Sequence, residues 1–291
     1  MTTRPHALPV DVSRPLRWAV ACAALGAVAP AVQAVVLYDP AVDSLPAAQG
    51  WLTSATSGAA AGTQTLSGGR LALDTTGSGV VAFGNARFSP VALDAAAGYA
   101  VDFSLQVLAE SHISPNRAGF SVLLVGSDPA QSVALSFWQD RVWVPTVDAS
   151  AADRFVQGAG AGFDTTAAFT DYRLLVQGGR YSLSAGGQAL FSGTLQDYRS
   201  GGLPYTVPNL VFFGDDSSRG SAQVALGAIS ISPVPEPASA WMLLAGLGVV
   251  VAFGIKSPAR RAAPRAGAPQ GSAGPLAGAS GGRERSELGG T

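Results

Sequence analysis

The fold is decided by the stretch Tyr99-Ala100-Val101-Asp102-Phe103-Ser104-Leu105-Gln106-Val107, in which the odd positions are apolar and the even ones small or polar. Successive side chains of a strand point to opposite faces of a sheet, so this alternation predicts a strand with one buried face. No stretch between residues 35 and 232 has the period of a long amphipathic helix. The same alternation returns in later segments: Phe120, Val122 and Leu124; Val133, Leu135 and Phe137; Tyr172, Leu174 and Val176; Tyr181 and Leu183, with residues 189–195 beside them; and Val224, Leu226, Ile229 and Ile231.

Short connectors between these segments predict hairpins. Gln177-Gly178-Gly179-Arg180 and Ala185-Gly186-Gly187-Gln188 place glycine where tight turns need a positive φ, and Gln139-Asp140-Arg141 joins two further strands. A slip in the alternation at Gly227-Ala228 predicts a β-bulge, and the Gly/Ser/Thr-rich residues 53–69 predict a loop. Many short strands without a fixed repeat favour an all-β fold, an antiparallel two-sheet sandwich or jelly roll, over residues 35–233.

Residues 1–34 have the three parts of a secretory signal peptide. The basic region contains Arg4, Arg14 and Arg17. A short apolar run at residues 18–29 follows, and Val32-Gln33-Ala34 offers small residues at a cleavage point, which would make Val35 the first mature residue. The alternative is an uncleaved anchor. The only cysteine, Cys22, lies in this segment, so the mature chain is expected to fold without a disulfide.

Residues 234–261 combine an extended motif, an apolar run and a basic cluster. The motif is Pro235-Glu236-Pro237, whose prolines keep the chain extended. Residues 238–255 carry no charge and are just long enough to span a bilayer as one helix. Lys256, Arg260 and Arg261 follow, and by the positive-inside rule they predict a cytoplasmic C-terminus. The remaining residues, 262–291, are rich in Gly, Ala, Pro and Ser and are predicted to be disordered.

This order of motif, helix and basic cluster resembles the PEP-CTERM sorting signal. The resemblance implies recognition by an exosortase, a membrane-embedded cysteine transpeptidase of Gram-negative bacteria, with cleavage near Pro235-Glu236-Pro237. It further implies an inner-membrane intermediate and delivery of the body to the cell envelope, the cell surface or the extracellular matrix. Tails of this family usually stop soon after the basic cluster, so the continuation to Thr291 departs from the pattern.

A second resemblance covers most of residues 35–232. It is carried by Arg117-Ala118-Gly119-Phe120-Ser121-Val122, by residues 135–143 and by Asn209-Leu210-Val211-Phe212-Phe213-Gly214-Asp215-Asp216. These segments resemble the choice-of-anchor surface domains, close to type Y, in which one body is combined with different anchoring tails. Their order is also similar to concanavalin A-like lectin and laminin-G folds. The resemblance implies a fold rather than a ligand.

Charge and residue types argue against several functional classes. Residues 35–233 hold nine arginines and no lysine against fourteen aspartates and one glutamate, a net charge of −6, which is unsuited to nucleic acid. His112 is the only histidine there, and one histidine supplies too few ligands for a zinc site. We expect it to be a solvated loop residue rather than part of a catalytic triad. Glu110 is the only glutamate, whereas glycoside hydrolysis needs two carboxyl groups at a defined separation. We therefore expect no enzyme activity.

Two groups of residues are candidates for binding. Trp138 and Trp143 flank the turn at Asp140 and Arg141, and with Arg117 they could stack and hydrogen-bond a sugar; the alternative is that Trp138 is buried. The second candidate is the pair that follows an apolar strand, namely Asp215 and Asp216. It could ligate Ca²⁺, or the two carboxylates could simply cap backbone N–H groups in a turn.

These observations predict an exported, non-catalytic component of the cell surface or matrix that contacts exopolysaccharide and needs no cofactor. One alternative is a lectin-like module that binds carbohydrate with the help of Ca²⁺. The other, which lacks a visible catalytic constellation, is a surface glycoside hydrolase.

Overall fold

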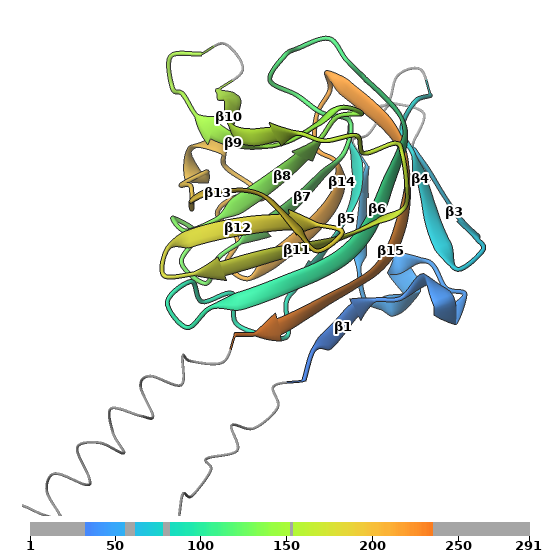
Figure 1. The fold of residues 1–291 in the computed structure, drawn as a ribbon, viewed down its shortest axis with the longest axis horizontal. Coiled ribbons are helices and arrows are strands. Elements are labelled where there is room, and N and C mark those ends of the chain that lie inside the picture. Colours follow the sequence, from blue (N-terminus) through green and yellow to red (C-terminus); the bar gives the residue numbers. More distant parts are fainter. Residues whose placement is uncertain (1–32, 56–61, 78–81, 152–153, 235–291) are drawn as a thin grey trace, which may run out of the picture. The chain divides into compact units, whose positions relative to one another are not determined.

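Two antiparallel β-sheets form the fold (Figure 1). The computed structural model describes residues 33–55, 62–77, 82–151 and 154–234. One sheet has eight strands in the order β13-β12-β11-β6-β15-β4-β3, with β1 also paired to β15. Its strands are β1 (Val35–Tyr38), β3 (Thr63–Ser67), β4 (Arg70–Asp74), β6 (Tyr99–His112), β11 (Thr170–Gln177), β12 (Arg180–Ala185), β13 (Gln188–Thr194) and β15 (Gly220–Pro233).

The second sheet has seven strands in the order β10-β9-β8-β7-β14-β5-β2. Its strands are β2 (Leu52–Ala55), β5 (Phe83–Phe88), β7 (Ser121–Val125), β8 (Val133–Phe137), β9 (Arg141–Val147), β10 (Phe155–Gly162) and β14 (Leu210–Asp215). The helices in the described part of the chain are three short 3₁₀ turns, η1 (Pro40–Val42), η2 (Pro46–Gln49) and η3 (Arg199–Gly201). The predicted all-β, two-sheet antiparallel fold is confirmed.

The predicted turns and the predicted bulge are present. Gly178 and Gly179 have φ of 60° and 75°, and Gly186 and Gly187 have φ of 55° and 78°, as two-residue hairpins of the primed type require. The β8–β9 hairpin is closed by the Trp138 N–H, which donates to the Arg141 carbonyl at 2.9 Å. In β15 the pairing with β6 jumps from Leu226 to Ile229, which places the bulge at Gly227-Ala228.

The prediction of a loop at residues 53–69 is wrong for the residues that the structure describes. Residues 53–55 belong to β2 and residues 63–67 to β3, which are the edge strands of the two sheets. β2 is exposed along its whole length and is held by backbone pairing with β5. An edge strand of this kind buries no face, so its sequence carries no alternation from which it could be recognised.

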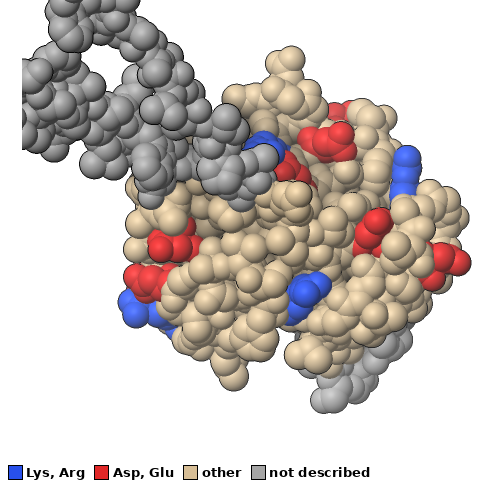
Figure 2. All heavy atoms as spheres, turned by 90° about the horizontal axis from the view of Figure 1, so that it is seen from below, with Lys and Arg blue, Asp and Glu red and all other residues tan. Residues whose placement is uncertain are grey.

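Charged side chains are sparse on the surface. Figure 2 shows acidic and basic side chains singly or in small groups, separated by uncharged surface, on the face seen there. Of the few ion pairs in the described residues, Arg173–Asp102 at 2.9 Å and Arg199–Asp197 at 2.6 Å have partners that are all well exposed. Exposed pairs of this kind contribute little to stability, so burial of apolar surface must stabilise the fold.

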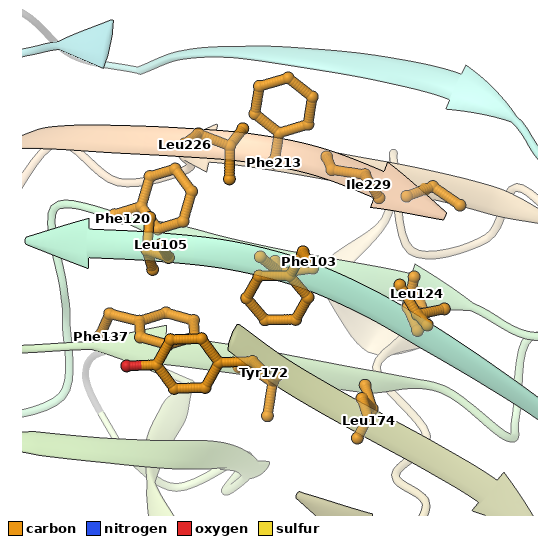
Figure 3. Packing of buried hydrophobic residues seen from close by; sticks show 14 of the residues in the cluster. Phe103, Leu105, Phe120, Leu124, Phe137, Tyr172, Leu174, Phe213, Leu226 and Ile229 are labelled. Carbon is orange, nitrogen blue, oxygen red and sulfur yellow. The ribbon is translucent and has the colours of Figure 1, made fainter. Parts of the chain in front are cut away.

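The core lies between the inner faces of the two sheets (Figure 3). Phe103 from β6 stacks on Tyr172 from β11 at 5.3 Å between ring centroids, and Phe137 from β8 meets Tyr172 edge-on at 5.4 Å. The odd residues of β6 from Tyr99 to Val107 are all buried, as their alternation predicted. The two sheets are therefore joined by aromatic contacts between strands that are distant in sequence.

The first and the last strand of the described residues, β1 and β15, pair with each other, and Val35 pairs with Ile231. The last strand ends at Pro233, and the Val234 N–H donates to the Gly98 carbonyl at 3.1 Å. Residues 1–32 of the predicted signal peptide, the Pro235-Glu236-Pro237 motif, the basic cluster and residues 262–291 lie outside the described residues. So does the predicted membrane helix at 238–255; the described part of the chain contains no helix with the length and hydropathy to cross a membrane.

Candidate functional site

The outer face of the seven-stranded sheet is covered, although strands of a sandwich commonly face water on that side. β7, β8 and β14 are buried at every position, on both faces. Their outward residues form a second apolar cluster with a side chain from the segment between β13 and β14, Tyr198. The Tyr198 hydroxyl donates to the Pro145 carbonyl on β9 at 2.8 Å, which fixes this segment across the sheet.

Beside this covering segment lies a cavity of about 210 Å³, which we call the aromatic hollow. Phe155 packs against Tyr205 at 5.2 Å and against Tyr198 at 5.8 Å between ring centroids. Aromatic rings and polar groups therefore share one concave surface, as in many ligand sites. The aromatic walls are Trp143, Phe155, Tyr198 and Tyr205, and the polar groups are Asn116, Arg117, Ser136 and Asp216.

The polar groups of the aromatic hollow are held in place by neighbouring strands. The Arg117 guanidinium donates to the Asn116 carbonyl at 3.0 Å and the Phe155 carbonyl at 3.3 Å, and it lies 5.6 Å from the centre of the Phe155 ring. The Trp143 indole Nε1 is buried and has no hydrogen-bond partner among the described residues. A buried donor without a partner is costly unless a ligand or water accepts from it.

Asp216 supplies the acidic group of the hollow. Its carboxylate accepts from the Tyr205 hydroxyl at 3.3 Å. The residue is exposed, yet protein surrounds the concavity in which its carboxyl group lies. This crowding raises the pKa of Asp216, while the Ser121 hydroxyl and the charge of Arg117 act in the opposite direction.

A second cluster joins the single histidine and the single glutamate of the sandwich. His112 Nδ1 lies 3.0 Å and 3.1 Å from the two Glu110 carboxylate oxygens, and the imidazole stacks on Trp138 at 4.1 Å with an interplanar angle of 3°. Burial raises the pKa of Glu110, whereas its bond to His112 and one from the Gly119 N–H lower it. With Gln139 and Asp140 these residues line a shallow hollow.

His112 is exposed, as expected, but it does not lie in a loop, since β6 continues to His112. Val107 pairs with Val224 but Ala109 pairs with Gln223, so Leu108 is an extra residue that forms a bulge. After the bulge the even positions take the inner side, because Glu110 pairs with the core residue Ala222. A bulge re-aims the side chains that follow it, which is why simple alternation missed this cluster.

The predicted sugar-binding residues are divided between the two places. Trp143 and Arg117 line the aromatic hollow, whereas Trp138 and Asp140 belong to the Glu110–His112 cluster. Trp138 is half-buried, one face of its indole is covered by His112, and its Nε1 donates to the Arg117 carbonyl at 2.7 Å. Trp138 therefore links the two places. Arg141 is half-buried and lines neither hollow.

The two residues of the predicted calcium site, Asp215 and Asp216, have different surroundings and different hydrogen-bond partners. Asp215 has the parity of Val211 and Phe213, which lie in the core, and it accepts from the Ser217 N–H at 2.9 Å. Asp216 instead contacts Tyr205. The described residues contain no group of three or more His, Cys, Asp or Glu side chains that could hold a metal ion. The bond to Ser217 is the turn cap that the sequence offered as the alternative, and calcium binding stays a prediction.

Replacing Asp215 with asparagine is expected to flatten the pH dependence of stability. Burial raises the pKa of Asp215 to about 8, so between roughly pH 4 and 8 the native state keeps a proton that the unfolded state releases. The free energy of unfolding should therefore fall as the pH rises through this window, by on the order of a few kcal/mol. Urea unfolding at several pH values in this window measures the free energy of unfolding. The exposed Asp43→Asn variant should keep the wild-type slope, and an unchanged slope in Asp215→Asn would contradict the prediction.

Comparisons with known proteins identify the tail and the fold. A family model described as the PEP-CTERM protein-sorting motif matches residues 233–261. No curated protein matches the sequence. A carbohydrate esterase from Shiga toxin-encoding bacteriophage phi24B is similar in structure, with a TM-score of 0.51 and 13% identity over 70% of this chain and 100% of that chain.

Two further solved structures have weaker similarity. A protein of unknown function with a galectin-like fold from Bacillus subtilis has a TM-score of 0.41 and 12% identity, over 69% of this chain and 98% of that chain. A lectin from Bauhinia forficata in complex with GalNAc has a TM-score of 0.40 and 12% identity, over 70% of this chain and 98% of that chain. At these identities a likeness concerns the fold alone. The motif is the informative match: this is a β-sandwich protein that carries the PEP-CTERM sorting motif, which implies export and sorting to the cell envelope.

Proposed function

We propose that this protein is a non-catalytic component of the cell surface or extracellular matrix that binds exopolysaccharide in the aromatic hollow. Its delivery would follow the route implied by the motif: export after cleavage behind Ala34, an inner-membrane intermediate held by residues 238–255, and processing by an exosortase near Pro235-Glu236-Pro237 in a Gram-negative bacterium. The observation that carries the binding proposal is a single hollow in which the aromatic walls stand beside Asn116, Arg117 and Asp216.

The hollow suits a sugar for a simple chemical reason. A sugar ring has apolar C–H faces and a rim of hydroxyl groups, so it needs both a flat aromatic contact and hydrogen-bonding partners. Tyr205 and Phe155 provide the rings, while Arg117 and Asn116 provide donors and Asp216 an acceptor.

The Glu110 environment supports a binding role over glycoside hydrolysis. Its side chain is only 3% exposed, and both carboxylate oxygens are within hydrogen-bond distance of His112. A glycosidase acid must reach the glycosidic oxygen, with a second carboxyl group positioned across the bond. Glu110 is almost fully covered, and its bonds suit the positioning of His112 beside Trp138.

Replacing Tyr205 with alanine is expected to weaken binding of oligosaccharides by about fivefold, since one stacked ring contributes on the order of 1 kcal/mol. Titration of the purified protein with neutral and acidic oligosaccharides, followed by tryptophan fluorescence, measures the affinity. The matched control is Phe88→Ala, which removes a 61% exposed ring that does not line the hollow. If the wild-type protein bound none of the sugars, or Tyr205→Ala bound as tightly as Phe88→Ala, the aromatic hollow would not be the binding site.

A further inference from the structure

A second cavity adjoins the aromatic hollow on the same face of the seven-stranded sheet. It encloses about 440 Å³, and its walls include Leu123, Phe212, Leu203 and Pro204. Leu203 is 79% exposed and forms a lip. We call this cavity the apolar hollow. Leu123 and Phe212 lie on the outer face of the sheet. The sequence predicted strands with only their inner face buried, so apolar residues were not expected on this side.

The two hollows are contiguous. Tyr205 and Asp216 line both of them, so the boundary between the hollows is formed by this single pair of side chains. The Tyr205 hydroxyl is 3.3 Å from the Asp216 carboxylate, which is long for a hydrogen bond between oxygen atoms. A ligand hydroxyl could replace this contact at little cost, and a chain could then continue from one hollow into the other.

Together the hollows cross the whole sheet. The aromatic hollow takes lining residues from β10, β9 and β8, for example Phe155, Trp143 and Ala134. The apolar hollow takes them from β7, β14, β5 and β2, in the order of the sheet. With strands about 4.8 Å apart, seven strands span roughly 30 Å. A path of that length is suited to several sugar units, whereas a single sugar would leave most of it empty.

The charges along this path favour a neutral ligand. Arg117 is the only cationic side chain among the described residues that line the two hollows, and its charge is opposed by the carboxyl group of Asp216, while Asp215 is buried. The surrounding sandwich carries a net charge of −6 over residues 35–233. A polymer with a carboxylate on each unit would find no net positive charge in the hollows and would be repelled by the acidic sandwich.

We propose that the ligand is a neutral linear polysaccharide whose chain lies across the strands and occupies both hollows, passing over Tyr205 and Asp216. This inference rests on the proposed function and adds the ligand's charge, its length and a second contact region. Leu203 is a specificity-determining residue in this arrangement, because it contacts only the part of a chain that extends beyond the aromatic hollow.

The test compares chain lengths with the full-length protein in detergent. Di- and hexasaccharides of the cello, laminari and manno series serve as neutral probes, and hexagalacturonate as the acidic one. We expect at least one neutral hexasaccharide to bind at least tenfold more tightly than its disaccharide and than hexagalacturonate. The Leu203→Ala variant should bind the hexasaccharide three- to tenfold more weakly than the wild type and should bind the disaccharide with unchanged affinity. Ile113→Ala, which removes an equally exposed apolar side chain (84%) outside both hollows, should change neither.

Equal affinity for the two lengths, tighter binding of the acidic probe, or a Leu203→Ala variant that matches Ile113→Ala would each overturn the inference. None of these results would remove the aromatic hollow as a binding site. The proposed function fails separately, if none of the probes binds at all or if Tyr205→Ala has no effect on the disaccharide.

Discussion

Replacing Pro235, Glu236 and Pro237 together with alanine is expected to abolish processing and delivery of the protein to the cell surface. Each proline lacks an N–H and fixes its φ, so the motif favours an extended conformation that a processing enzyme can grip, whereas an alanine run directly before residues 238–255 would favour a continuous helix. The family model that matches residues 233–261 places this motif at the start of the matched segment.

Intact-mass measurement and surface labelling in the native host test this expectation. The wild-type protein should begin at Val35 and end near Pro235, and the triple variant should keep its full tail and remain with the inner membrane. Pro264→Ala, outside the matched segment, is the control and should be processed normally. If the triple variant reached the surface with the wild-type mass, the prediction that sorting requires Pro235-Glu236-Pro237 would be wrong.

Replacing Gly119 with alanine is expected to destabilise the sandwich severely. A Cβ atom at this position would lie 2.0 Å from the Ser221 carbonyl carbon and 2.2 Å from its oxygen. Both are backbone atoms of β15, a strand paired with β4 and β6, so they cannot rotate away as a side chain would. We expect a loss of about 3 kcal/mol or more, which for a domain of this size lowers Tm by roughly 6–12 °C.

Gly77→Ala is the matched control for this substitution, because no heavy atom lies within 4 Å of the Cβ position and φ is not in the left-handed region. Its Tm should stay within about 2 °C of the wild type. Thermal unfolding monitored by circular dichroism gives the Tm of both variants. A Gly119→Ala variant as stable as Gly77→Ala would contradict the close packing of the β6–β7 connector against β15.

Much of the fold could be predicted because it follows from local features. Alternation in the stretch that includes Phe103 identified the central strand β6, and glycine pairs such as Gly178-Gly179 identified its hairpin neighbours. The bulge at Gly227-Ala228 was visible as a slip in the same alternation. Each of these signals depends on residues within a few positions of one another.

The candidate site was only partly predictable. Arg117 and Trp143 were among the predicted sugar-binding residues, but Tyr198, Tyr205 and Phe155 were not, because nothing local shows that residues 195–209 fold over the sheet. The outward residues of β7, such as Leu123 and Val125, offered one signal. They make this strand apolar on both faces, which is unusual unless something covers it.

The sequence by itself determined the all-β fold, its tight turns and the sorting motif, because each depends on neighbouring residues. Only the tertiary structure decided which side chains meet. It paired Glu110 with His112 and stacked His112 on Trp138, which lies 26 residues further along the chain, and it brought Asp216 and Arg117 into the same hollow. The physical reason is that strand pairing and the bulge at Leu108 set the direction of these side chains, and both depend on contacts between distant parts of the chain.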